Sequence, residues 1–264
     1  MVLRSLFLAV LMTSAAGAQW FHVTVPGTPR TPDGKPNLTA PTPRLADGHP
    51  DLSGIWSSSR PARGGADKAG ENPSYDLNNY LPEGQTIPLN AEGKALYQHR
   101  LDTFGVERPT NWCMPHGIPD AMLIPMNYKI VQTPGMTAIL YEEFNHYRQI
   151  FTDGRSLPKD QNPAWFGYSV GKWDGDTFVV DTVGFNDQTW LDNYGHPHSE
   201  GLHATERFTR TDFGHLKIDL TVDDPKYYTK PFTATIQFRM NADTEMIENI
   251  CENERDQSHY LKVK

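Results

Sequence analysis

The sequence predicts a mainly β protein: an antiparallel meander that closes into a barrel, with a β-sandwich as the alternative and one short helix beside it. Two observations lead to this fold class. From about residue 128 onward, short segments with alternating apolar and polar residues are separated by turn residues at regular intervals. No helical periodicity occurs between these segments, which argues against a parallel α/β sheet.

Turn residues and alternation together place the strands. Pro134-Gly135 separates two of them, and Asp174-Gly175-Asp176 separates two more. The alternation is clearest in His215–Val222, where every second residue is apolar, as in a half-buried strand. The expected strands are Asp51–Trp56, Tyr128–Thr133, Met136–Glu142, Tyr147–Thr152, Phe166–Trp173, Thr177–Val183, Ala204–Thr211, His215–Val222, Phe232–Met240 and Glu245–Cys251.

A single helix is expected ahead of most of the strands. Asn90 can cap a helix over Ala91–Asp102, because an Asn side chain accepts a hydrogen bond from a free backbone N–H of the first turn. Gly105 follows and ends the helix.

Composition divides the chain into three segments. Residues 1–18 have one basic residue, a short apolar run and the small residues Ala16-Gly17-Ala18, which is the pattern of a cleaved signal peptide. Residues 19–50 are rich in Pro, Thr, Gly and Asp, and are expected to form an extended N-terminal arm over the domain surface. Residues 51–264 then form a single β domain. The signal peptide implies an exported protein, periplasmic or secreted.

Net charge, hydropathy and cysteine content limit the possible partners and the compartment of the protein. A formal net charge of −8 with interspersed signs argues against nucleic acid as a partner. Beyond the signal peptide no apolar stretch is long enough to span a bilayer, so no stable membrane insertion is expected. In an exported chain, Cys113 and Cys251 are expected to form a disulfide. The oligomeric state is left open.

Gly54-Ile55-Trp56 resembles the Gly-x-Trp that opens the first strand of lipocalins and related calycin barrels. In those proteins the Trp plugs the closed end of the barrel. The resemblance implies a calycin-like barrel, and the interior of such a barrel is the expected ligand cavity.

A longer part of the chain, roughly residues 50–255, resembles a family of secreted bacterial proteins common in soil bacteria. The likeness is carried by Gly167–Thr182, which continues to the His/Glu segment, and by Ile150–Arg155 and Asp223-Asp224-Pro225. It implies a signal peptide and a β fold but no reaction. The residues that match the family's recurrent pattern are Asp153, Arg155, Asp176, His198, Glu200, Glu206 and Arg207.

The segment from Gly195 to Arg207 concentrates the side chains that move protons near neutral pH. His198 with Glu200 or Glu206 could transfer a proton to or from a substrate, and Arg207 could hold a developing negative charge on an oxygen. These four residues are the predicted catalytic set. No cofactor is expected for this chemistry.

Alternation along Ala204–Thr211 puts Glu206 and Arg207 on opposite faces of the strand, so one of them is expected to face the barrel interior. A buried charge in that position must be paired or functional, because an isolated one is too costly.

Two other interpretations of the same segment stay open. His196, His198 and His203 could bind a divalent metal, although Pro197 favours a loop or an edge strand and the spacing to Glu200 does not match a cupin motif. Alternatively, the charged residues form salt bridges across the strands and the histidines cap a surface loop.

A second candidate segment, Glu142–Arg148, joins two strands through a tight turn that carries carboxylates, an imidazole and a guanidinium. Asp153-Gly154-Arg155 forms another turn, from which Arg155 can reach a carboxylate. The predicted substrate-binding residues are Arg155, Glu142, His146 and Tyr168.

The leading functional hypothesis is an exported enzyme that acts on an apolar or aromatic small molecule in a barrel pocket. Acid–base chemistry at His198 would suit hydration, isomerisation, cyclisation or hydrolysis. The alternative is a non-catalytic, lipocalin-like protein that binds or transports a hydrophobic ligand. The third hypothesis is a structural envelope protein without a pocket.

Overall fold

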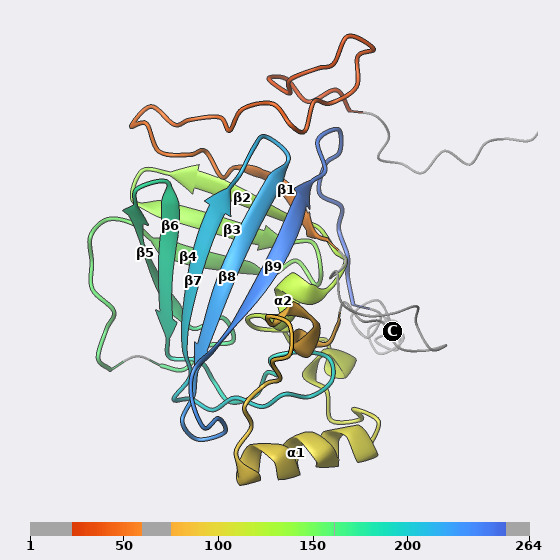
Figure 1. Ribbon diagram of the computed structural model, residues 1–264, viewed down its shortest axis with the longest axis vertical. Coiled ribbons are helices and arrows are strands. Elements are labelled where there is room, and N and C mark those ends of the chain that lie inside the picture. Colours follow the sequence, from red (N-terminus) through yellow and green to blue (C-terminus); the bar gives the residue numbers. More distant parts are fainter. Residues whose placement is uncertain (1–22, 60–74, 161, 252–264) are drawn as a thin grey trace, which may run out of the picture.

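Nine strands form a closed barrel in which each strand pairs with the next along the chain and the last returns to the first (Figure 1). The structure is a computed structural model and describes residues 23–59, 75–160 and 162–251. The strands are β1 (Gly54–Ser58), β2 (Tyr128–Thr133), β3 (Met136–Tyr141), β4 (Tyr147–Phe151), β5 (Tyr168–Asp174), β6 (Thr177–Val183), β7 (His203–Arg210), β8 (His215–Asp223) and β9 (Phe232–Met240).

The predicted barrel is thus confirmed, and the alternative β-sandwich is wrong. The expected strand Glu245–Cys251 is also wrong, because Asn249 forms only an isolated bridge with Glu143 there. The predicted signal peptide, residues 1–18, lies outside the described residues.

One pair of neighbouring strands, β4 and β5, runs parallel, whereas the other neighbours run antiparallel. Strand directions cannot alternate all the way around a ring of nine, because nine is odd. The parallel pair resolves this mismatch, but its ladder holds only Ile150 opposite Ser169 and Phe151 opposite Val170. The barrel wall is therefore least tightly paired at the β4–β5 junction.

Every second side chain of each strand points into the barrel, and these side chains fill its interior. On β8, Leu216, Ile218, Leu220 and Val222 are buried, while the residues between them are partly exposed. Large side chains from other strands occupy the same space, among them Trp56, Tyr128, Phe178, Phe208 and Phe238. The centre of the barrel is consequently a packed core.

Trp56 is fully buried near the end of the barrel where the arm lies. Its indole N–H donates to the Leu52 carbonyl over 3.0 Å, and the Arg210 guanidinium lies 5.0 Å from its ring centroid. Gly54 precedes it with φ of 142°, and a Cβ there would lie 2.5 Å from Met240 Cε. Only glycine fits this start of β1 without displacing Met240.

Short helices gather at the opposite end of the barrel. They are η2 (Leu77–Tyr80), α1 (Ala91–Asp102), η3 (Pro109–Trp112) and α2 (Asp120–Leu123). The predicted cap of α1 is confirmed, since Asn90 accepts a 2.9 Å hydrogen bond from the Gly93 N–H. None of the helices in the described residues is long and apolar enough to cross a membrane.

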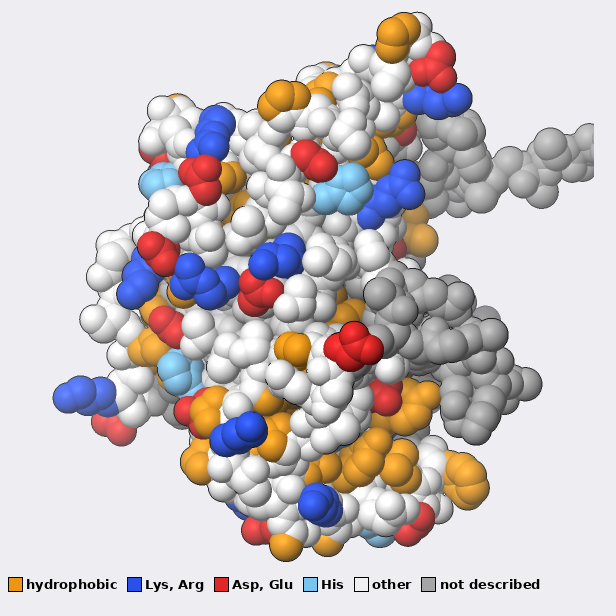
Figure 2. Space-filling view, in the orientation of Figure 1, with side chains coloured by type: hydrophobic (Ala, Val, Ile, Leu, Met, Phe, Trp, Pro, Cys, Tyr) orange, Lys and Arg blue, Asp and Glu red, His pale blue; other side chains and the backbone are white. Residues whose placement is uncertain are grey.

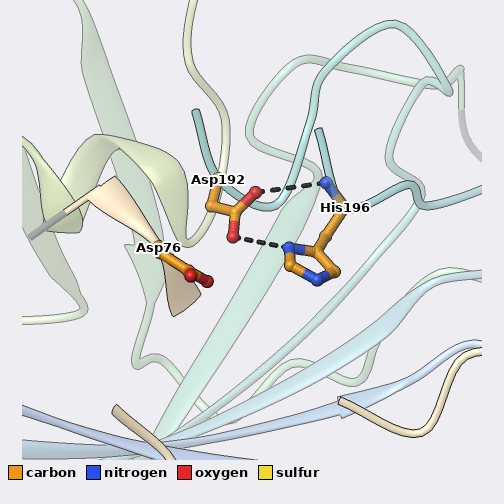
Figure 3. A group of neighbouring side chains, drawn as sticks. All are labelled: Asp76, Asp192 and His196. Atoms are coloured by element: carbon orange, nitrogen blue, oxygen red, sulfur yellow. Dashed lines mark hydrogen bonds and ion pairs between the residues drawn. The ribbon is translucent and has the colours of Figure 1, made fainter. Parts of the chain in front are cut away.

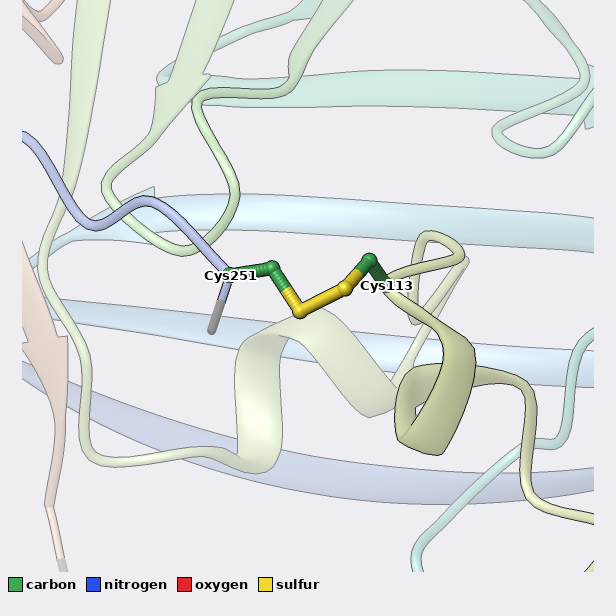
Figure 4. Close-up of a disulfide and its surroundings, with 2 residues drawn as sticks. All are labelled: Cys113 and Cys251. Carbon is green, nitrogen blue, oxygen red and sulfur yellow. A yellow bond between two sulfur atoms is a disulfide. The ribbon is translucent and has the colours of Figure 1, made fainter. Parts of the chain in front are cut away.

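The predicted disulfide between Cys113 and Cys251 is confirmed (Figure 4). It joins the turn after η3 to the segment that follows β9, across a sequence separation of 138 residues. On the face in Figure 2, acidic and basic side chains are mixed along the barrel and form no patch of one sign.

The N-terminal arm crosses the end of the barrel remote from α1 (Figure 1). Backbone hydrogen bonds connect Leu38 and Ala40 to the β7–β8 turn, through the N–H groups of Gly214 and Phe213. The arm then enters β1 through Leu52, which is fully buried.

Candidate functional site

An ion pair lies inside the barrel, between Arg148 of β4 and Glu206 of β7. Both side chains are at most 1% exposed. Arg148 donates to both carboxylate oxygens of Glu206 and also to Ser169, over 3.1 Å, and to Thr182, over 2.8 Å. The interior face of β7 therefore carries Glu206, which confirms that one charged set on this strand points inward.

Two tyrosines lie near this ion pair. The pKa of Tyr141 is raised to about 12, chiefly by burial; Arg148 lowers it and the Glu206 charge raises it. Burial also raises the pKa of Tyr128 well above its usual value. Both hydroxyls are consequently protonated at neutral pH. The Tyr128 hydroxyl has no hydrogen-bond partner among the described residues.

A pocket of about 450 Å³ opens beside the ion pair at the β4–β5 junction. His146, Trp165 and Tyr168 line it, together with Arg148 and Ser169. We call it the junction pocket. It lies where the wall of the barrel is least tightly paired, so residues of the interior face and of the outer face both contribute to it.

The junction pocket brings together part of the predicted substrate-binding set. His146 and Tyr168 line it, and Arg155 donates to the Tyr168 hydroxyl over 3.1 Å from an ion pair with Asp153. Glu142 lies apart from them. It is buried and accepts hydrogen bonds from the Asn127 backbone and side chain and from the Ile247 backbone N–H.

The structure does not bring the four predicted catalytic residues together. His198 is buried in the loop between β6 and β7, and Glu200 is exposed in the following turn. Glu206 lies inside the barrel, whereas Arg207 lies on the outside and donates to Asp174 over 2.8 Å. Glu206 and Arg207 are separated because successive side chains of a β-strand point to opposite faces of the sheet.

Both ring nitrogens of His198 are engaged locally. Nδ1 donates to the Ser199 carbonyl over 3.2 Å, and the Thr189 hydroxyl lies 2.5 Å from Nε2. Burial lowers the pKa of His198, so the ring is neutral at pH 7 and its Nε2 accepts from Thr189. This arrangement leaves no ring nitrogen directed at a predicted carboxylate partner.

The three histidines of the metal alternative are likewise separated. His203 lies on the outside of β7, with Nε2 3.3 Å from Asp181. His196 belongs instead to a group with Asp76 and Asp192, whose candidate ligand atoms lie within 4.8 Å of one another (Figure 3). Within the described residues, this is the group whose side chains lie close enough together to hold a metal ion.

Hydrogen bonds already occupy most of this group. Asp192 accepts from the Nδ1–H of His196 over 2.6 Å, and from the backbone N–H groups of Leu77, Tyr194, Gly195 and His196. Five donors exceed the roughly four lone-pair sites of a carboxylate. Asp192 therefore holds its loop together. Asp76 accepts from the Asn78 backbone N–H over 2.9 Å, and the Asn78 amide nitrogen lies 3.4 Å from Nε2 of His196.

A third buried imidazole, His116, lies between two carboxylates. Nδ1 is 2.5 Å from Asp120 and Nε2 is 2.7 Å from Glu143. Burial lowers the pKa of His116, but the two carboxylates raise it more, to about 10. His116 is thus an imidazolium that joins the segment before α2 to the β3–β4 turn.

A second pocket, of about 440 Å³, lies at the mouth of the barrel beneath the arm. We call it the mouth pocket. Inward-facing residues of four strands form its walls: Gln132, Thr137, Trp173 and Phe178. Leu45, Ala46 and Asp47 of the arm also line it, on the side away from the strands. Trp173 and Phe178 pack with ring centroids 5.1 Å apart.

Sequence reasoning found His146 and Tyr168 of the junction pocket but missed Arg148 there and the residues of the mouth pocket. Arg148 lies in the expected strand Tyr147–Thr152, and its alternation with Ile150, which is apolar, could have placed it inside the barrel. No local signal could have shown that Leu45 and Trp173 line the same pocket, because the arm lacks the apolar alternation that indicates which way a side chain points. Comparison of the chain with protein-family models, with curated proteins and with solved structures finds no match.

Proposed function

We propose that this protein binds a small, neutral, apolar or aromatic molecule in the mouth pocket. The observation that carries the proposal is a pocket of about 440 Å³ with Trp173 and Phe178 in its wall and the arm above it. This volume lies in the range of small-molecule sites, which are mostly apolar with a few polar groups. Gln132 and Thr137 are such polar groups.

Charge restricts the class of ligand. Among the described residues that line the mouth pocket, Asp47 is the only ionisable one. An anionic ligand would meet no basic partner there and would be repelled by Asp47. A neutral ligand loses no charge solvation on entry, so neutral aromatic molecules are favoured.

Export remains part of the proposal. The Cys113–Cys251 disulfide supports it, because disulfides persist in oxidising compartments. The resemblance to secreted bacterial proteins and to calycin barrels points the same way and is itself a prediction.

Titration with the neutral fluorescent probe N-phenyl-1-naphthylamine tests the site. Trp173→Ala should weaken binding about tenfold, because burial of a large aromatic side chain contributes roughly 1.5 kcal/mol or more. Trp165→Ala is the matched control, since Trp165 is also partly buried but lines the junction pocket. Absence of probe binding to the wild type, or equal binding by Trp173→Ala, would contradict the proposal.

An acid–base enzyme at the junction pocket is the second candidate. The observation that favours it is His146 beside Tyr168, with Arg148 and Ser169 also lining the pocket. Hydration, isomerisation, cyclisation or hydrolysis of a neutral compound would suit an imidazole there. Substrate depletion by wild type, His146→Gln and His198→Gln, followed by mass spectrometry over a small-molecule library, separates the two imidazoles. Loss of turnover in His146→Gln alone would support the junction pocket.

A further inference from the structure

The arm contains the same ten-residue unit twice. Residues 29–38 and 43–52 share Pro, Arg, Asp, Gly, Pro and Leu at corresponding positions. We call residues 29–38 the first unit and residues 43–52 the second unit. The repetition predicts that both fold alike, and the structure bears this out.

The two units close with matching backbone hydrogen bonds. In the first unit, the N–H of Thr31 donates to the Lys35 carbonyl over 2.9 Å, and that of Gly34 donates to Thr31 over 2.8 Å. In the second, Leu45 donates to His49 over 2.8 Å, and Gly48 donates to Leu45 over 3.0 Å. Each is thus a small hairpin whose glycine has a positive φ.

Each hairpin clamps a carboxylate of the barrel with its arginine. Arg30 donates twice to Asp243 after β9, and both distances are 2.6 Å. Arg44 donates twice to Asp176 in the β5–β6 turn, over 2.6 and 2.7 Å. The repeated arginine is therefore a docking residue, and the two units dock at separate places on the rim of the barrel.

Only the second unit covers the mouth pocket. Its residues Leu45, Ala46 and Asp47 line that pocket, and the His49 ring stacks on Trp173 with centroids 4.7 Å apart. The first unit and Asp243 do not line it. A ligand that enters the mouth pocket must therefore displace the second unit, whereas the first unit does not obstruct it.

The second unit is firmly anchored at both ends and weakly attached between them. Before it, the carbonyls of Leu38 and Ala40 accept backbone hydrogen bonds, and at its end Leu52 is buried in the core. The base of the hairpin is also held, because Thr42 donates to the Arg210 carbonyl over 3.3 Å and the Arg210 guanidinium donates to the Asp51 carbonyl. The tip, residues 44–49, is held to the barrel by the Arg44–Asp176 pair, with side chains 48% and 61% exposed, and by the His49 stack. Exposed ion pairs add little to stability, so the tip can lift while the base of the hairpin and its anchors stay in place.

We infer that the second arm unit is a hinged cover of the mouth pocket, latched by Arg44 on Asp176, and that the ligand enters and leaves when it lifts. This inference rests on the proposed function. The latch residues Arg44 and Asp176 do not line the pocket, so they control access without contacting the ligand. Release of the latch should change the rates of binding more than the affinity.

Stopped-flow mixing with N-phenyl-1-naphthylamine tests the cover. Arg44→Ala and Asp176→Ala should each raise the association and dissociation rates by about two- to fivefold, with Kd changed by less than about twofold. The charge-swapped double variant Arg44→Asp with Asp176→Arg should return both rates toward the wild type. Arg30→Ala is the matched control and should leave both rates unchanged.

The outcomes separate the cover from the binding site. If the wild type binds the probe and Trp173→Ala weakens binding, but the latch variants leave both rates unchanged, the hinged cover is overturned and the binding site stands. If Arg30→Ala alters the rates as much as Arg44→Ala, the second unit is not the cover. If the wild type does not bind the probe, both the proposed binding site and the hinged cover are contradicted.

Discussion

Arg148 and Glu206 form a fully buried ion pair inside the barrel, although 58 residues separate them along the chain. Burial lowers the pKa of Arg148, but the Glu206 carboxylate raises it more, so the guanidinium remains charged. Ser169 and Thr182 accept its other hydrogen bonds. The pair is thus satisfied within the wall formed by β4 to β7.

Removal of one member of this pair should be costly. Glu206→Gln leaves the Arg148 charge buried without a counter-charge, and we expect the free energy of unfolding to fall by about 3–5 kcal/mol. Urea denaturation measures the change. Arg207→Ala, on the next residue but on the outside of β7, should cost less than about 1 kcal/mol. Equal losses in both variants would contradict a distinctive role for the interior pair.

The imidazolium of His116 should make stability depend on alkaline pH. Its pKa in the folded protein is about 10, above the value of an unfolded His, so the stabilisation is complete below about pH 6.5 and is lost as pH rises through 10. We expect His116→Gln to cost about 2–4 kcal/mol at pH 6 and progressively less toward pH 10.5.

Thermal unfolding of the wild type and of His116→Gln across this range measures the difference. His99→Gln serves as the control, because His99 is about half exposed and pairs with Glu107 at the surface. A constant difference from pH 6 to 10.5 would show that the His116 charge does not contribute.

Asp192 should matter as a structural hub. Asp192→Asn places an amide N–H₂ among the backbone donors that converge on the carboxylate, and we expect a loss of about 2–4 kcal/mol. Asp181→Asn, at the exposed partner of His203, should be nearly neutral. Chemical denaturation of the two variants provides the comparison.

The same loop also tests the metal alternative. Because Asp192 already receives five N–H donors, we expect excess Zn²⁺ to shift the Tm of the wild type by less than about 1 °C. A larger increase that disappears in His196→Gln would instead establish a metal site at Asp76 and His196.

The disulfide should stabilise strongly because it closes a long loop. With a sequence separation of 138 residues between Cys113 and Cys251, the chain-entropy model predicts a loss of about 5 kcal/mol when both are replaced by Ser. Urea denaturation of the double variant measures it. Addition of a reducing agent should destabilise the wild type to the same extent and leave the double variant unchanged.

Local patterns in the sequence determined the barrel strands and the long helix α1, but not the short helices η2, η3 and α2, and they wrongly predicted a strand over Glu245–Cys251. Alternation and turn residues placed β2 to β9 within a residue or two, and Asn90 marked the start of α1. These signals succeed because the period of a strand and the cap of a helix depend on neighbours along the chain. Alternation also showed that either Glu206 or Arg207 would face the interior.

Tertiary structure alone decided which side chains meet. The odd number of strands requires a parallel pair in the ring, and this pair lies at β4–β5, beside the junction pocket. Closure of the ring brings Arg148 of β4 to Glu206 of β7. Closure of the barrel beneath the arm places Leu45 over Trp173, far away in sequence. Such contacts depend on ring closure and on the path of an arm without apolar alternation, and neither can be predicted from residues that are neighbours in the sequence.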